Sequence, residues 1–385
     1  MCKRGAIDFK SRDVVSFPSG KDEQYWNYST HTSIKHRILS YYLRLWSSKL
    51  GSVANQIVFW DCFAGRGVYY EGQPGSPLLV LEESRRCGER VKLICICIEK
   101  DTSSFKTLQA TLRKLYPEME NDRWFAFNSN YIDIYHQAMN GDIHELDGLT
   151  TCPSLFFLDP TGFKDIPLSI VRNMMSRSAR EVFITLMVED VKRHRRNEKV
   201  LHHFKELFGE ERLDELDDLC GQPNPELAIA DYYEKRLNDR NGANVKYTLK
   251  FELKPTYRDV VKYYLIFGSN HPDGLGAMHR TMRAISNNRD FSYRGRSEGQ
   301  TSLESFLEDG DLIQEIADWI YGLPFRIGNL RLVKFHAYRS TNYSDKDVRT
   351  AVVRLIRERK LEFHPPDETA KKKGVVGNRY FRRVK

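Results

Sequence analysis

The most informative chemistry in this sequence belongs to four residues that follow a short apolar run. Residues 57–60, Ile-Val-Phe-Trp, are β-branched or aromatic, which predicts a strand buried on both faces. Asp61 closes this strand, and Phe63, Gly65 and Gly67 follow in a tight loop that leads to a helix. Ligands of open α/β sheets bind off the carboxyl ends of the strands, in loops of this kind. The sequence therefore predicts that these four residues line a ligand site.

The loop at Gly65 and Gly67 lacks the patterns that bind phosphates. It has no third glycine for GxGxxG and no Lys-Ser or Lys-Thr for GxxxxGK[ST]. S-adenosylmethionine (SAM) has no phosphate and carries a sulfonium cation, an amine and a carboxylate, which suit an aspartate and a closely approaching glycine backbone. We therefore predict SAM as the ligand. The alternative is a structural β-turn-α unit in which the small residues serve packing.

Strands and helices alternate over the first half of the chain, which predicts an α/β fold with a doubly wound, mostly parallel sheet. The strands are expected at 57–61, 91–98, 124–128, 155–158 and 181–188, and the helices at 33–50, 76–87, 101–116, 132–141 and 167–176. A helical insertion at about 190–241 and two strands at 245–254 and 260–268 follow. These late strands resemble the closing antiparallel hairpin of the class I methyltransferase sheet, whereas a nicotinamide-type Rossmann domain ends in a parallel strand.

The C-terminal part has the pattern of a winged helix-turn-helix. Helices at about 304–321 and 328–338 precede a helix over 344–360, which Ser344 caps, and two strands flank a basic loop. The predicted organisation is an extension at 1–30, a methyltransferase-like domain at 31–285, a linker at 286–302 and a winged-helix domain at 303–385.

Positive charge is concentrated at this end of the chain. The whole sequence carries 60 Lys and Arg against 52 Asp and Glu, and residues 331–385 alone carry 16 against 6. This asymmetry indicates a contact with DNA or RNA, and the alternatives are a solvated basic tail or a protein-docking module. The residues expected to contact nucleic acid are Arg349, Arg354, Arg357, Lys371, Lys372 and Lys373.

Composition indicates a cytoplasmic protein without membrane contact. No stretch approaches the ~20 apolar residues of a membrane helix, and the first residues, MCKRGAIDFKSRD, lack the apolar core of a signal peptide. The seven cysteines are scattered, and we expect them to be reduced thiols. Only Cys95 and Cys97 are close in sequence, so no metal site is predicted.

Several motifs occur in a defined order along the chain. They are Lys35-His36, DCFAGRG at 61–67 with Gly75-Ser76-Pro77, LDPTGF at 158–163, Arg193 after the fifth strand, and FGSNHPDG at 267–274. Together they resemble the three-Cys-motif partner proteins (TcmP), a bacterial family with a methyltransferase-like fold. The resemblance covers about 30–285, and a winged-helix domain often follows in such proteins. It implies a functional partner, a radical-SAM-like protein with a three-cysteine motif.

Polar residues near the ends of the other predicted strands would complete a SAM site. Glu99 can accept both ribose hydroxyls of an adenosine ligand, and Asp101 is expected to cap the next helix. By the methyltransferase resemblance, either Asn128 or Asn130 reads the adenine amine, with Asn130 preferred. Lys35 and His36, on the first helix, can fold over the SAM carboxylate, and a solvated polar face is the alternative.

LDPTGF is similar to the Asp-Pro-Pro-aromatic motif of amino methyltransferases, in which the acid orients a base amine and the aromatic ring stacks on the base. The similarity implies catalytic roles for Asp159 and Phe163. Thr161 and Gly162 depart from that motif, and Phe163 lies one position late. Further candidates are His271 and Asp273 for the substrate mouth, and Arg193 to Arg196 for phosphate binding.

Two functional hypotheses follow from these observations. The first is a SAM-dependent methyltransferase that acts on nucleic acid or on a nucleic-acid-associated partner. The second is a non-catalytic adaptor with a SAM-type fold that recruits the radical-SAM-like partner to nucleic acid. The altered motif at 159–163 favours the second.

Overall fold

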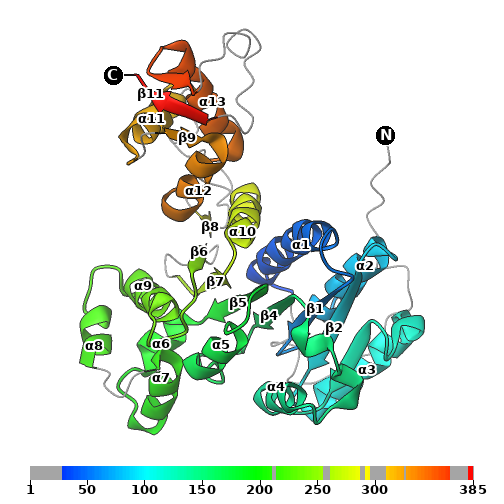
Figure 1. Ribbon diagram of the computed structural model, residues 1–385. Coiled ribbons are helices and arrows are strands. Elements are labelled where there is room, and N and C mark those ends of the chain that lie inside the picture. Colours follow the sequence, from blue (N-terminus) through cyan, green and yellow to red (C-terminus); the bar gives the residue numbers. More distant parts are fainter. Residues whose placement is uncertain are drawn as a thin grey trace.

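A computed structural model describes the chain in two connected parts (Figure 1). The described residues are 28–209, 214–254, 261–286, 291–294, 309–324, 327–364 and 380–384. The first part holds an eight-stranded sheet between two layers of helices, and the second holds three helices and a three-stranded sheet. Within these residues no helix is both long and apolar enough to cross a membrane.

The large sheet has the strand order β3-β2-β1-β4-β5-β7-β6-β8. Its strands are β1 (Gln56–Asp61), β2 (Lys92–Ile98), β3 (Trp124–Phe127), β4 (Ser154–Leu158), β5 (Arg180–Leu186), β6 (Tyr247–Lys254), β7 (Tyr263–Ser269) and β8 (Ser292–Arg294). The first five strands are mutually parallel, and β7 is antiparallel to both β5 and β6. The predicted α/β class, the mostly parallel sheet and the late antiparallel hairpin of a methyltransferase-like fold are therefore confirmed.

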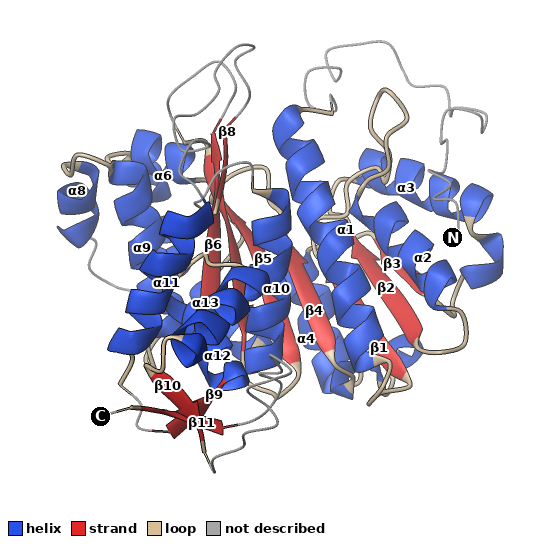
Figure 2. Cartoon of the chain, turned by 90° about the horizontal axis from the view of Figure 1, so that it is seen from above, coloured by secondary structure: helices blue, strands red, loops and turns tan. Residues whose placement is uncertain are grey.

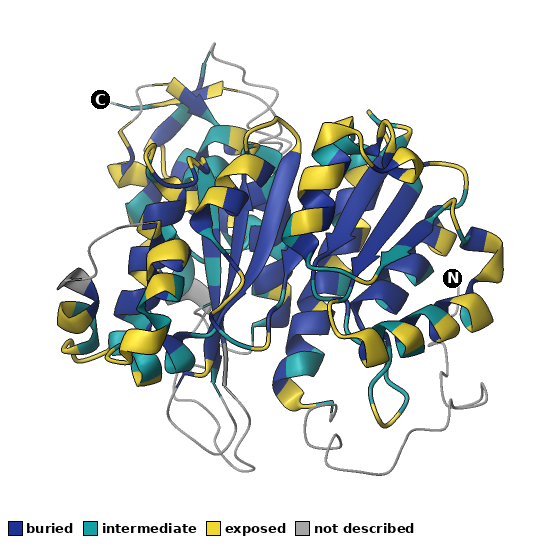
Figure 3. Cartoon of the chain, turned by 90° about the horizontal axis from the view of Figure 1, so that it is seen from below, coloured by how far each residue is buried: buried dark blue, intermediate teal, exposed yellow. Residues whose placement is uncertain are grey.

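Helices cover both faces of this sheet, as Figure 2 shows. One face packs against α1 (Thr30–Leu50), α2 (Ser76–Cys87), α3 (Thr102–Leu115) and α10 (Pro272–Ile285). The other packs against α4 (Tyr131–Asn140), α5 (Leu168–Met174), α6 (Val188–His194), α7 (Leu201–Phe208), α8 (Asp214–Cys220) and α9 (Pro225–Asn238). The central strands are buried on both faces (Figure 3), which explains why they are apolar throughout rather than alternating.

Some of the described helices begin with a side-chain cap, and others, such as α2 and α5, do not. The Asp101 side chain accepts a hydrogen bond from the Ser104 N–H at 2.8 Å, so the predicted cap of α3 is confirmed. The cap of α2 is Gly75, and Ser76 is already the first helical residue, followed by Pro77. Gly75 lies close to the preceding loop, and a side chain at that position would collide with the loop backbone.

The predicted linker at 286–302 contains a strand. β8 pairs in parallel with the end of β6, and Glu252 donates its N–H to the Phe291 carbonyl at 2.8 Å. No sequence pattern predicts this strand, because three paired residues are too few to establish a period of two. Pairing with the edge of β6 supplies the hydrogen bonds that the local sequence does not specify.

The described residues of the C-terminal part form three helices and a small antiparallel sheet of order β10-β11-β9. Its elements are α11 (Asp309–Gly322), β9 (Ile327–Asn329), α12 (Leu330–Ser340), α13 (Asp345–Arg357), β10 (Leu361–Phe363) and β11 (Tyr380–Arg383). The predicted cap Ser344 accepts from the Asp347 N–H at 3.1 Å. β9 was not predicted, and the basic loop with Lys371, Lys372 and Lys373 lies outside the described residues.

This part packs on α10 through α12. The Tyr338 ring lies against Gly276, where an added Cβ would come within 2.7 Å of the ring. His279 is buried and donates from Nε2 to the Thr341 carbonyl at 2.9 Å. Burial lowers the pKa of His279 to about 4, so the imidazole is neutral near pH 7. These contacts join the two parts through an apolar and hydrogen-bonded surface.

Candidate functional site

The loop after β1 is shaped by glycine. Gly65 and Gly67 have φ values of 59° and 76°, in the left-handed region that side chains disfavour. Gly75 donates its N–H to the Gly67 carbonyl at 2.7 Å, and a Cβ on Gly75 would lie 2.9 Å from that oxygen. The sequence thus folds residues 65–75 back on themselves at the carboxyl end of β1.

Glu99 holds this loop at the end of β2 through hydrogen bonds. Its carboxylate accepts hydrogen bonds from the Gly65 N–H at 2.8 Å and from the Asp101 N–H at 2.7 Å. Asn128 donates to the Glu99 carbonyl at 2.9 Å and supports the same turn from β3. A carboxylate has about four acceptor positions, so Glu99 can hold the loop and still accept from a ligand.

Asp61 is the most unusual residue of the site. It is 0% exposed, and neither carboxylate oxygen has a hydrogen-bond partner among the described residues. Burial raises its pKa to about 7, and the nearby Asp159 and Glu99 carboxylates add to this effect. The Ser76 side chain and the Phe63 N–H lie close enough to the carboxylate to oppose the shift, although neither meets it with hydrogen-bond geometry. Burying a carboxylate without a hydrogen-bond partner destabilises the folded chain. A ligand that donates a hydrogen bond to Asp61 would offset this cost.

Asp159 lies across from Asp61, at the end of β4. It forms an ion pair with Lys35 of α1 through Oδ2, while Oδ1 is buried and has no partner in the described chain. His36, the next residue of α1, is 4% exposed, and its Nδ1 also has no described partner. Burial and the Lys35 charge lower the pKa of His36 to about 3, so its ring is neutral at physiological pH.

Aromatic rings surround these polar groups. Tyr28, His36 and Tyr69 pack together with ring centroids 5.1 to 5.6 Å apart. Burial raises the pKa of Tyr69, and the Asp159 charge raises it further. Tyr263, at the start of β7, is buried, and its pKa rises first through burial and then through Asp159. Buried polar groups and a cluster of aromatic rings therefore lie side by side at this edge of the sheet.

The sequence analysis missed Tyr28, Tyr69 and Tyr263. For Tyr69 a signal existed, because it follows Gly67 within the glycine loop, and loop residues of this kind often contact ligands. Tyr263 could not have been found by periodicity, because it lies about 100 residues from Asp159 in a strand with an ordinary apolar pattern. Only the position of β7 beside β5 brings it to the site.

The structure brings Asp61, Glu99, Asp159 and Lys35 to one edge of the sheet. Phe63 lies nearby, partly buried, with its ring 5.2 Å from that of Tyr131. The other two predicted residues have structural partners. Asn130 caps α4 by accepting from the Ile132 N–H at 2.9 Å, and Phe163 is 5% exposed and stacks on Phe204 at 4.5 Å. This packing does not support the predicted stacking of Phe163 on an acceptor.

The prediction that His271 and Asp273 line the substrate mouth is wrong. β7 runs antiparallel to β5, so its end at Ser269 pairs with Glu181, at the amino end of β5. The five-residue separation along β5 puts this edge about 17 Å from the carboxyl ends of the strands. There His271 caps α10, and Asp273 pairs with Lys49 at 2.7 Å. The reversal of chain direction in the hairpin explains the error.

The basic run 193–196 contacts acids of its own helical layer. Arg193 pairs with Asp190, and Arg195 and Arg196 lie 3.3 and 3.6 Å from Asp217. These contacts are partly exposed and contribute little to stability. They favour the helix-surface interpretation of this run over a phosphate site.

The buried polar atoms of this site match the charged groups of SAM. Both oxygens of Asp61, one oxygen of Asp159 and Nδ1 of His36 are buried without described partners at the same edge. A ligand with a cationic amine and a sulfonium matches two carboxylates there, and the glycine loop admits a ligand close to its backbone. The residues that can hold SAM are thus Asp61, Gly65, Gly67 and Glu99, and Asp159 lies beside them with one oxygen free for an acceptor.

Comparisons with known proteins find structural likeness only. No family model and no curated protein matches the sequence. A Legionella pneumophila protein of the DUF519 family has a TM-score of 0.38 and 13% identity, over 62% of this chain and 85% of that one. Human methyltransferase-like protein 13, solved with SAH, has a TM-score of 0.34 and 13% identity, over 72% and 98%. Because both TM-scores are below 0.5 and both identities are 13%, neither structure supports a conclusion about this chain.

Proposed function

We propose that this chain binds SAM at the carboxyl edge of β1, β2 and β4 and transfers its methyl group to an acceptor held at Asp159. The observation that carries the proposal is Asp61, a fully buried carboxylate without described partners beside a glycine loop. SAM supplies an electrophilic methyl group for direct displacement. Positioning and electrostatics supply most of the rate in such a reaction.

Each site residue has a distinct task in this proposal. Asp61 accepts from the cationic end of the cofactor, and Glu99 accepts from its ribose while it holds the Gly65 loop. The unpartnered Oδ1 of Asp159 orients a donor group of the acceptor. Tyr69 and Tyr263 exclude water from the carboxylates, which strengthens their electrostatic effect. The acceptor class we propose is nucleic acid or a nucleic-acid-associated partner.

Isothermal titration of the full chain with SAM tests the cofactor. We expect saturable binding, lost in Asp61→Ala and retained in Asp142→Asn, a change at an exposed aspartate away from the site. Transfer of label from methyl-labelled SAM to nucleic acid or protein then tests catalysis. Asp159→Asn should abolish transfer and leave SAM affinity within about threefold. No heat and no thermal shift at millimolar SAM would refute the proposal.

A non-catalytic adaptor is the second candidate. The Lys35–Asp159 ion pair and the burial of Phe163 against Phe204 favour it, because both occupy groups that an acceptor would need. In this version the chain binds SAM or no cofactor and recruits the radical-SAM-like partner that the TcmP resemblance implies. SAM binding without label transfer, with that partner present, would decide for the adaptor.

The nucleic-acid role of the C-terminal part belongs to the same proposal. Helix, strand, helix, helix and two strands is the element order of a winged helix, and α13 would be its recognition helix. Arg349 and Arg357 are exposed on α13, while Arg354 pairs with Glu358 at 2.7 Å. We propose that this face binds nucleic acid and that the protein acts in the bacterial cytoplasm.

A further inference from the structure

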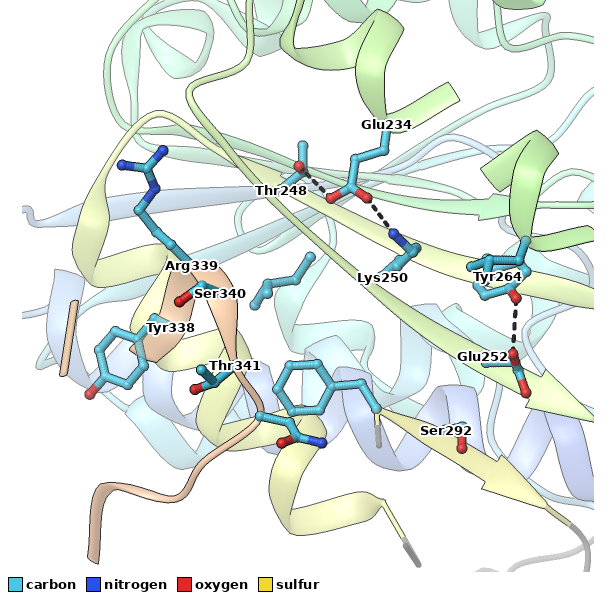
Figure 4. Close-up of a pocket in the computed structure, with 14 residues that line it drawn as sticks. Glu234, Thr248, Lys250, Glu252, Tyr264, Ser292, Tyr338, Arg339, Ser340 and Thr341 are labelled. Carbon is cyan, nitrogen blue, oxygen red and sulfur yellow. Dashed lines mark hydrogen bonds and ion pairs between the residues drawn. The ribbon is translucent and has the colours of Figure 1, made fainter. Parts of the chain in front are cut away.

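A cavity of about 600 Å³ lies away from the SAM site, along the outer edge of β6 (Figure 4). One side is formed by α9, with Leu227 and Glu234, and the other by the end of α12 and the residues after it. Residues of both parts of the chain therefore line it. The cavity has no role in the proposed methyl transfer.

The backbone of β6 faces this cavity. Glu252 donates its N–H to the Phe291 carbonyl, so the backbone of residue 252 points toward β8. Backbone groups alternate in direction along a strand, so Lys250 and Thr248 point to the same side. β8 pairs only with residues 252–254. Among the described residues no strand bonds to the outward N–H and C=O groups of Thr248 and Lys250.

An unpaired strand edge is a template for another extended chain. At β6 this edge lies in a slot between α9 and the end of α12, with a volume of about 600 Å³. Leu249 and Phe291 supply apolar surface along it. The geometry thus offers backbone hydrogen bonds together with pockets for alternate side chains.

The charged residues that line the cavity indicate which kind of ligand it can bind. Glu234 already accepts from Thr248 at 2.6 Å and from Lys250 at 2.7 Å, and Lys250 also pairs with Asp231 at 2.5 Å. Arg339 pairs with no carboxylate in the described part of the chain. It is exposed, and its guanidinium lies 5.9 Å from the Phe335 ring. Arg339 is therefore the charge that is available for a ligand.

We propose that this slot binds an extended segment of a partner polypeptide, which adds as a strand to the edge of β6 and sets an acidic side chain against Arg339. The backbone of Thr248 and Lys250 supplies the pairing, and Arg339 supplies selectivity for acid. This surface is separate from the SAM site and from the exposed face of α13. It holds whether or not the chain is a methyltransferase.

The test uses the full chain and a defined panel of six-residue peptides. Each peptide is capped at both ends and fluorescently labelled, with one Asp placed at each position in turn in a Thr-Val background. We expect at least one peptide to bind with a dissociation constant of roughly 10–500 μM, as measured by anisotropy. N-methylation of its backbone should abolish binding, because it removes the strand hydrogen bonds.

Charge exchange then tests the contact at Arg339. Arg339→Glu should weaken the Asp peptide at least tenfold, and a Lys-for-Asp peptide should recover affinity for that variant. Thr248→Pro removes one outward N–H and should weaken binding, whereas Thr248→Val, which keeps the N–H, should not. Thermal unfolding confirms that each variant is folded.

Three results would overturn the proposal. One is the absence of any binding peptide up to 1 mM. Another is binding that survives both N-methylation and Arg339→Glu. The third is a dimer of the free chain that Arg339→Glu dissociates, because the occupant would then be a second copy and not a partner.

Discussion

SAM affinity should depend on pH through one buried carboxylate. The pKa of Asp61 is about 7 in the free chain because the carboxyl is buried without partners. If the cationic cofactor binds only the ionised form, protonation of Asp61 competes with binding. With a pKa of about 7, the dissociation constant should be roughly 25-fold larger at pH 5.5 than at pH 7.5.

Titration calorimetry at pH 5.5, 6.5 and 7.5 measures this dependence. The amine of SAM titrates near pH 8, so the comparison with Asp61→Asn isolates the contribution of the side chain. The variant should bind more weakly at pH 7.5 and show a nearly flat profile. His36 cannot produce the effect, because its pKa of about 3 lies below the measured range.

Proton release gives an independent readout of the same event. In two buffers with different ionisation enthalpies, the wild-type chain should release about half a proton per SAM at pH 7. The Asp61→Asn variant should release none from this position. An affinity that stays constant from pH 5.5 to 7.5, or an equal slope in the variant, would refute the assignment of Asp61 as the cofactor's counter-charge.

Three further predictions concern the loop, a second buried acid and the C-terminal face. Gly75→Ala should lower the melting temperature and weaken SAM at least tenfold, because its Cβ would meet the Gly67 backbone; Gly322→Ala, which meets no atom within 4 Å, is the control. Glu181 is buried and its pKa is raised to about 7, so the unfolding free energy should fall by about 2–3 kcal/mol from pH 5 to pH 8. Glu181→Gln should remove most of that fall in urea titrations, and an unchanged fall would contradict it. Alanine at both Arg349 and Arg357 should flatten the salt dependence of DNA or RNA binding by about one unit per lost phosphate contact, leaving SAM affinity unchanged; an unaltered slope would remove α13 from the proposed interface.

The sequence by itself determined the order of the elements and the edge at which the site forms. Apolar runs buried on both faces specify the central strands, and each strand ends near a polar residue such as Asp61, Glu99 or Asp159. Because parallel strands end at one edge of the sheet, these residues could be grouped before any coordinates were known. The glycine loop was equally visible, because only glycine adopts its backbone angles readily.

The tertiary structure decided which of these side chains keep polar atoms without a hydrogen-bond partner. Lys35 and Asp159 are 124 residues apart, and only the packing of α1 across the sheet makes them an ion pair. The direction of β7 brings Tyr263 to the site and takes Asp273 to the opposite edge. Phe163 and Asn130 have ordinary local sequences, yet packing on Phe204 and the cap of α4 occupy them. Sequence patterns record local preference, whereas partners, burial and pKa depend on contacts between segments that are distant in the chain.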